Sequence, residues 1–95
     1  MFVILVHYLK GIEEVDKHLV AHREYLEQGY QKGYLIASGP QNPRTGGVLL
    51  SQLQDRQILD AFLENDPFSL HGIGEYQVIE FTPVKYHKDF QIFIN

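Results

Sequence analysis

The sequence contains no cysteine among its 95 residues. Disulfide bonds, thiolate metal ligands and cysteine nucleophiles are therefore excluded, and a reducing compartment is favoured over a secreted scaffold. A chain of this length forms one domain and hides only about 60 to 65% of its unfolded surface in a single core. Because disulfides cannot stabilise that core, we expect association with further copies of the chain to contribute to stability.

Positive charge is also scarce, with 8 Lys and Arg against 12 Asp and Glu and a formal net charge of -4. This balance opposes the phosphate neutralisation that dominates nucleic-acid affinity, so nucleic acid is not an expected partner. Long hydrophobic runs are missing as well. The apolar run Met1–Leu9 has no basic leader and is too short to span a bilayer. We therefore expect a cytoplasmic protein with an intact N-terminus and no membrane partner.

Apolar residues make up 44% of the chain, and their spacing predicts its secondary structure. A run rich in β-branched residues at 2–6 predicts a strand that is apolar on both faces. From Ile12 to about Lys32 apolar residues recur three or four apart, which predicts an amphipathic helix. His22 falls at the rim of the apolar stripe of that helix, whereas Arg23 falls on the polar side.

The second half of the sequence alternates strands, turns and a further helix. Asp55 is a plausible N-cap for a second helix, and Asp66 followed by Pro67 predicts a short additional helical turn that ends near Gly72. Gly39–Gly47 holds three Gly and two Pro, which predicts a loop with special backbone demands. The remaining strands are expected at residues 34–37, 48–53 and 76–81.

The predicted order is strand, helix, strand, strand, helix, strand, which is the ferredoxin-like βαββαβ pattern of the α+β class. It places one antiparallel sheet under helices that lie on one face only. Because the first strand is apolar on both sides, a second subunit or the tail has to cover the other face, and we expect a face-to-face homodimer. The domain is predicted at residues 1–86. The apolar tail at 87–95 is expected to dock on its own sheet or on a partner subunit.

His22 and Asp66 are the best candidates for chemistry. If the first helix packs beside the Asp-Pro turn, the carboxylate would orient the imidazole and stabilise its protonated form, making His22 a general acid or base. The structural alternative for His22 is a packing role, and the alternative for Asp66 is a helix cap. A structural and a catalytic role can hold at once. His18 and His22, four apart, would permit shared metal ligation, but no third ligand is evident and neither a metal nor another cofactor is expected.

Four further residues are candidates for substrate binding. Arg44 lies in the Gly-rich and Pro-rich loop and would clamp a carboxylate or a phenolate as a planar fork, although it would equally anchor the loop. Ser38 at a strand end would attack a substrate or, more simply, bond to the loop. Tyr25 and Phe68 would form an aromatic wall around the pair or pack in the core.

Several short motifs occur together in this sequence, and they are His22–Leu26 (HREYL), Ala37–Pro40 (ASGP), Arg44–Gly47 (RTGG), Asp66–Phe68 (DPF) and Glu75–Phe81 (EYQVIEF). Over about residues 2 to 86 the chain thereby resembles the YciI-like (YCII-related) proteins. The resemblance implies a ferredoxin-like fold of the dimeric α+β barrel group, in which two sheets enclose a small-molecule cavity. It also implies an active-site pair at His22 and Asp66. One similar group is a dehydrochlorinase acting on a chlorinated hydroxyhydroquinone.

The sequence departs from that pattern at Leu19, where many members carry an arginine, so an anion-binding role would be lost or moved, for instance to Arg44. The main hypothesis is a small homodimeric enzyme that moves a proton on a compact cyclic or phenolic substrate, as a lyase, an isomerase or a dehydrochlorinase. The alternative is a non-catalytic homo-oligomeric module that binds a small molecule or serves assembly.

Overall fold

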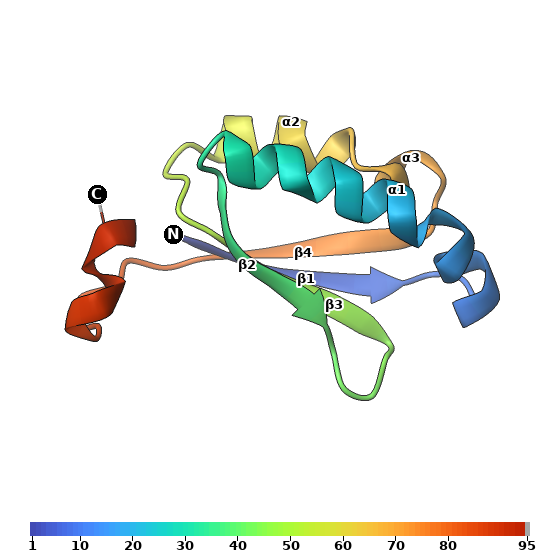
Figure 1. Cartoon of the computed structure of the whole chain (residues 1–95), viewed down its shortest axis with the longest axis horizontal. Helices are drawn as coiled ribbons and strands as arrows, with labels where there is room; N and C mark the ends of the chain where they lie inside the picture. The colour runs from blue at the N-terminus through green and yellow to red at the C-terminus, as the bar shows by residue number, and fades with distance from the viewer. Residues whose placement is uncertain (95) are drawn as a thin grey trace.

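The structure is a computed structural model, and it describes residues 1–94. Four strands form one antiparallel sheet in the order β2-β3-β1-β4. Three helices cover one face of this sheet (Figure 1). The chain therefore has the predicted α+β ferredoxin-like fold. The elements are β1 (Phe2–Tyr8), α1 (Ile12–Gln31), β2 (Leu35–Pro40), β3 (Gly46–Ser51), α2 (Arg56–Glu64), α3 (Pro67–Leu70), β4 (Gly74–Glu80) and a 3₁₀ helix η1 (Lys88–Phe93).

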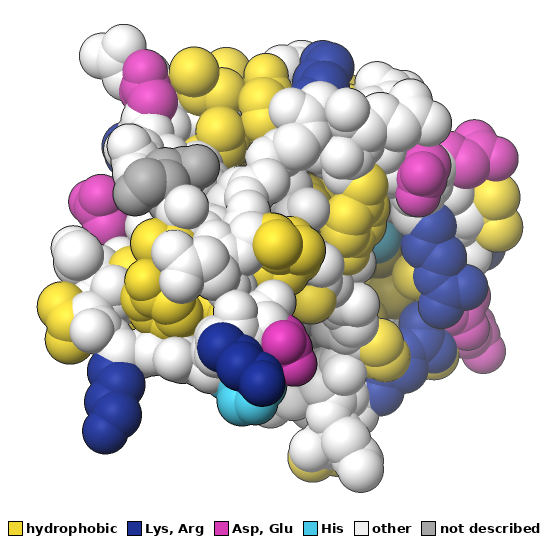
Figure 2. Space-filling view, turned by 60° about the vertical axis from the view of Figure 1, so that its left-hand side comes forward, with side chains coloured by type: hydrophobic (Ala, Val, Ile, Leu, Met, Phe, Trp, Pro, Cys, Tyr) yellow, Lys and Arg dark blue, Asp and Glu magenta, His cyan; other side chains and the backbone are white. Residues whose placement is uncertain are grey.

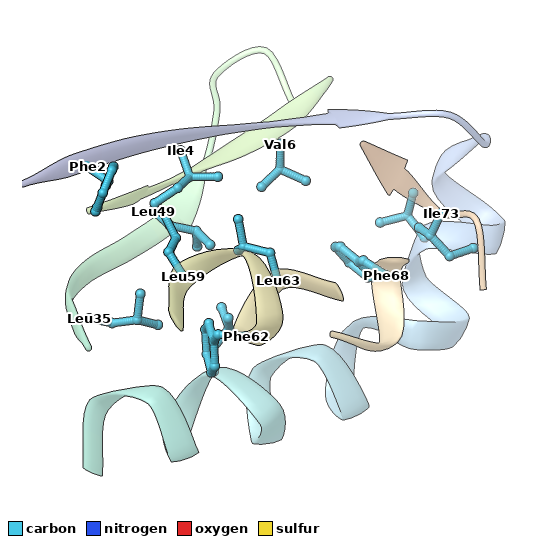
Figure 3. Close-up of a cluster of buried hydrophobic side chains, with 12 residues drawn as sticks. Phe2, Ile4, Val6, Leu35, Leu49, Leu59, Phe62, Leu63, Phe68 and Ile73 are labelled. Carbon is cyan, nitrogen blue, oxygen red and sulfur yellow. The ribbon is translucent and has the colours of Figure 1, made fainter. Parts of the chain in front are cut away.

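Strand β1 lies between β3 and β4 and organises the core. Because successive side chains of a strand point to opposite faces, Phe2, Ile4 and Val6 are buried under the helices, while Val3 and Leu5 point the other way and are half-buried. Figure 3 shows the core side chains of β1 directed toward the helices. The two-faced apolar pattern of the first strand is therefore a real feature of the fold.

The helices begin where the sequence predicts. Helix α1 buries Val15, His22, Leu26 and Gly29 along one stripe. Asp55 caps α2, and its side chain accepts hydrogen bonds from the backbone N–H groups of the second and third helical residues. In the part of the chain that the structure describes, no helix is both long and apolar enough to cross a membrane.

Strand β2 is longer than predicted and continues through Gly39 and Pro40, so the connecting loop shortens to residues 41–45. The prediction of a strand at 34–37 followed by a loop from Gly39 to Gly47 was therefore wrong at both ends of that loop, since β3 also begins at Gly46. β2 is an edge strand, where Pro removes no hydrogen bond that the sheet needs. Pro40 is paired with Gly47 and the hairpin extends past it. The longer hairpin brings Ser38, Gly39 and Pro40 into reach of α1.

The face of the sheet opposite the helices stays uncovered within one chain. Val48, Ile79 and Phe81 are 38%, 43% and 41% exposed. The tail does not cover this face, because η1 stands away from the sheet beyond the end of β4 (Figure 1), and none of its residues is buried. Docking of the tail on a partner subunit stays a prediction, and residue 95 at its end lies outside the described residues.

Candidate functional site

A cavity of about 210 Å³ lies between α1, the β2–β3 hairpin and α3. Its walls combine apolar and polar surface and come from elements far apart in the sequence, with apolar residues that include Val6, Leu19, Leu26, Leu49 and Phe68. Polar groups enter it from α1 through His22 and Arg23, from β1 through Tyr8, and from the hairpin through Ser38 and Arg44. An apolar cavity with a few convergent polar groups has the character of a small-molecule site.

The structure brings His22 and Asp66 together at this cavity. Nδ1 of His22 lies 2.8 Å from Oδ1 of Asp66. Both residues are buried, with 8% and 0% of their surface exposed. The contact forms because α1 packs directly beside α3, whose N-cap is Asp66. The expected juxtaposition of the two side chains is therefore present, and His22 is also one of the residues that line the cavity.

Asp66 is held by more than the histidine. Oδ1 also accepts the backbone N–H of Phe68 at 3.0 Å, which is the helix-cap bond of α3. Oδ2 accepts the hydroxyl of Tyr76 on β4 at 2.5 Å. Burial and the Asp66 carboxylate raise the pKa of the Tyr76 hydroxyl far above its ordinary value. The hydroxyl therefore keeps its proton and donates a hydrogen bond to Asp66. The Asp66 carboxylate thus both caps α3 and binds His22.

These bonds determine how the imidazole is presented. A carboxylate only accepts hydrogen bonds, so the Nδ1–H group of His22 donates to Asp66, and Nε2 is the ring nitrogen that this contact does not occupy. The imidazole also lies parallel to the ring of Phe68, with centroids 3.8 Å apart and planes at 2°. Tyr8 packs edge-on against Phe68 from the other side, at 6.1 Å. The orientation of the His22 ring is therefore set by its neighbours.

Arg44 and Ser38, which line the cavity, both have hydrogen-bond partners on α1. Arg44 Nη2 donates to Asp16 Oδ1 at 2.6 Å, and both side chains are exposed. This hydrogen bond raises the pKa of Arg44 above its ordinary value. Ser38 Oγ lies 2.6 Å from the hydroxyl of Tyr30 on α1. Arg44 and Ser38 thus both line the cavity, and each is tied to α1.

Tyr25 contacts α2 through its hydroxyl and its ring. Its hydroxyl donates to the backbone carbonyl of Phe62 at 2.7 Å, and its ring stacks on that of Phe62 at 4.9 Å. Burial raises the pKa of the Tyr25 hydroxyl above its ordinary value. Tyr25 is not among the residues that line the cavity. Its contacts join α1 to α2, so Tyr25 has a packing role in the core.

Three residues of the site were not singled out from the sequence. Tyr8 and Tyr76 sit on strands, where aromatic residues are common and give no functional signal. Arg23 was assigned to the polar face of α1, yet it lines the cavity because the hairpin rises beside that edge of the helix. Its position directly after His22 was the one available signal.

His18 does not join His22 at the cavity. Its ring stacks on that of His71, with centroids 4.4 Å apart. Across residues 1–94 there is no group of three or more His, Asp or Glu side chains placed to hold a metal ion.

The family model described as the YCII-related domain matches residues 1–82. The chain belongs to this family. Both His22 and Asp66, whose side chains are in contact, lie within the matched segment. The matched segment includes every element of the sheet and excludes η1. A comparison with functionally curated proteins gave no significant match.

Solved structures resemble the YCII-related chain over most of its length. One is 5-chloro-2-hydroxyhydroquinone dehydrochlorinase from Burkholderia phenoliruptrix, in complex with 2,5-dihydroxybenzoquinone, at 25% identity and a TM-score of 0.72, covering 85% of this chain and 92% of that one. Another is described as an antibiotic biosynthesis monooxygenase, at 20% identity and a TM-score of 0.56, covering 87% and 100%. The second likeness concerns the fold alone.

Proposed function

We propose that this chain is a small-molecule enzyme in which His22 transfers a proton to or from a compact cyclic or phenolic substrate. The observation that carries the proposal is the geometry of His22 at the cavity. Its Nδ1 is bound to the buried carboxylate of Asp66, and its face is held by Phe68. Nε2 is then the nitrogen available for substrate, and Asp66 supports the positive charge that develops when Nε2 takes a proton.

Membership of the YCII-related family and the likeness to a dehydrochlorinase support this class of reaction. Removal of hydrogen chloride requires a base that accepts a proton while chloride leaves with the electron pair of the C–Cl bond. His22 is the group at the cavity suited to accept that proton. The same arrangement would serve a lyase or an isomerase, since each moves a proton between a substrate carbon or oxygen and a fixed base.

The proposed enzyme is a homodimer. Support comes from the uncovered face of the sheet, where Val48, Ile79 and Phe81 are exposed on one side of the molecule. Apolar side chains exposed together on one sheet face of a short chain without disulfides are typical of an interaction site. A second copy of the same sheet would cover this face with the same residues, as a two-fold interface requires. The apolar tail would then lie against the partner subunit.

The test is a substitution that removes proton transfer and preserves the buried hydrogen bond. In His22→Asn the side-chain amide replaces the Nδ1–H group toward Asp66 but supplies no base. The assay uses halogenated phenols, 5-chloro-2-hydroxyhydroquinone and lactones. On a compound that the wild type turns over, kcat/KM of the variant should be about 10²-fold to 10⁴-fold lower. His18→Asn, one helical turn earlier and stacked on His71, is the matched control and should keep full activity.

The alternative, a non-catalytic binding or assembly module, makes a different prediction for the same variants. It expects no turnover of any of these compounds by the wild type, and a change in thermal stability alone for His22→Asn. Turnover by the wild type that survives in His22→Asn would remove this histidine from the mechanism.

A further inference from the structure

We propose that the cavity binds a single-ring organic anion, and that Arg23 is the residue that binds its charge. The ligand class is a carboxylate or phenolate oxygen carried on one ring, with the ring inside the cavity and the oxygen at its mouth. This inference deepens the proposed function and rests on it for the reaction, although the binding it describes is measured independently of turnover.

The charge on the cavity wall is of one sign. Arg23 and Arg44 line the cavity together with His22, and no Asp or Glu is among the described residues that do so. This is unusual for a chain whose formal net charge is -4. Clustered cations beside a low-dielectric apolar wall attract anions and repel cations. Figure 2 shows a hollow on the surface with a histidine inside it and Lys or Arg side chains along its rim.

The two arginines are not equivalent. Arg44 already donates to Asp16 at 2.6 Å, so its charge is largely neutralised and its main effect is to tie the hairpin loop to α1. Arg23 makes no hydrogen bond or ion pair with any residue in the described range 1–94. A guanidinium at the mouth of a cavity without a protein partner is free to bind a ligand oxygen in a two-pronged geometry.

The remaining walls select the rest of the ligand. Leu19, Leu26, Leu49 and Phe68 surround the space with apolar side chains. Its volume of about 210 Å³ is somewhat more than the roughly 150 Å³ that an apolar cavity needs to hold benzene. One ring with one or two small substituents therefore fits, and Leu19 adds to the apolar surface around it.

Position along α1 links the binding of charge to the proposed chemistry. His22 and Arg23 are neighbours in the chain, and both line the same cavity. His22 lies deeper, since it is 8% exposed, whereas Arg23 is exposed at the mouth. An anion held by Arg23 would place the body of its ring beside the imidazole. Arg23 is thus a specificity residue for the charge of the substrate.

Three simple probes separate charge from shape. Benzoate carries the ring and the charge, benzamide has nearly the same shape without the charge, and acetate has the charge without the ring. Isothermal titration calorimetry of the full chain should show benzoate binding, with benzamide and acetate each about tenfold weaker or more. Benzoate affinity should also fall as salt is added. Equal binding of benzoate and benzamide would overturn the proposal.

Variants assign the charge to one residue. Arg23→Gln should weaken benzoate about tenfold and leave benzamide unchanged, and Arg23→Lys should restore part of the loss. Arg56→Gln changes net charge equally at an exposed site on α2 and should have no effect, which controls for the general field. Arg44→Gln should have less effect than Arg23→Gln. Wild-type benzoate affinity in Arg23→Gln, or an equal loss in Arg56→Gln, would refute the assignment.

The outcome is distinguishable from that of the proposed function. Benzoate binding lost in Arg23→Gln together with turnover retained in His22→Asn would leave the anion site standing and remove the proposed chemistry. Turnover lost in His22→Asn together with unchanged benzoate binding in Arg23→Gln would support the proposed chemistry and refute the anion site at Arg23. Thermal unfolding of each variant checks that the fold is retained, which is expected because Arg23 is exposed and without a partner in residues 1–94.

Discussion

The imidazole of His22 lies flat on the ring of Phe68, 3.8 Å from centroid to centroid, while Asp66 binds the edge of the same imidazole at 2.8 Å. Both neighbours come from one short segment, because Asp66 is the N-cap of α3 and Phe68 lies in its first turn. A helix of four residues therefore sets both the face and the edge of the proposed catalytic group. Its cap bond and the hydrogen bond to histidine share one carboxylate oxygen.

This sharing makes Asp66 the most sensitive polar residue of the site. In Asp66→Ala the buried donors of His22, Phe68 and Tyr76 all lose their acceptor. We expect the free energy of unfolding to fall by about 3 to 5 kcal/mol, measured by urea denaturation. Asp66→Asn keeps one acceptor and should lose less. A loss below about 1 kcal/mol in Asp66→Ala would contradict this account of the site.

Tyr76 should couple the stability of the site to alkaline pH. Its pKa is raised in the fold by burial and by Asp66, so the unfolded chain loses this proton first as the pH rises. The stabilisation is complete below the unfolded pKa of about 10 and declines above it. In Tyr76→Phe the free energy of unfolding should fall by about 1 to 2 kcal/mol at neutral pH and should decline less steeply above pH 10.

The measurement for Tyr76 is chemical denaturation at a series of pH values. Tyr86→Phe is the matched control, because Tyr86 lies in the segment after β4 and is 37% exposed. It should reproduce the wild-type curve. The same steep alkaline decline in Tyr76→Phe as in the wild type would assign that decline to other groups.

The close approach of β1 and β3 beside the cavity depends on Gly46. A Cβ atom at this position would lie 1.9 Å from the backbone oxygen of Val6, so the two strands would have to separate. We expect Gly46→Ala to cost about 3 kcal/mol or more in urea denaturation. Gly39→Ala on the neighbouring strand is the control, because a Cβ there meets nothing within 4 Å. Its cost should stay within about 0.5 kcal/mol.

The uncovered face of the sheet should hold the proposed dimer together. Ile79 lies on this face, paired across the sheet with Val3. The wild type is expected to sediment as a dimer with a Tm that rises with protein concentration, whereas Ile79→Lys should be monomeric and less stable. Val20→Lys on α1 is the control, because Val20 is 67% exposed, and it should remain dimeric. A monomeric wild type at high concentration would exclude this interface.

Much of the fold follows from local patterns. The strand at β1, the amphipathic period of α1 and the caps at Asp55 and Asp66 were all predicted, since each depends on residues close together in the chain. The end of β2 was not predicted, because Pro40 is tolerated only through the position of β2 at the sheet edge. That position is a property of the whole sheet.

The site divides in the same way. The sequence by itself determined that chemistry without cysteine would have to use groups such as His22 and Asp66, and its motifs indicated that pair. Only the tertiary structure decided that they meet across 44 residues, that Tyr76 binds the second carboxylate oxygen, and that Arg23 faces the cavity while Arg44 is taken by Asp16. Periodicity assigns a side chain to a face of its own helix or strand, but its partners depend on how distant elements pack together.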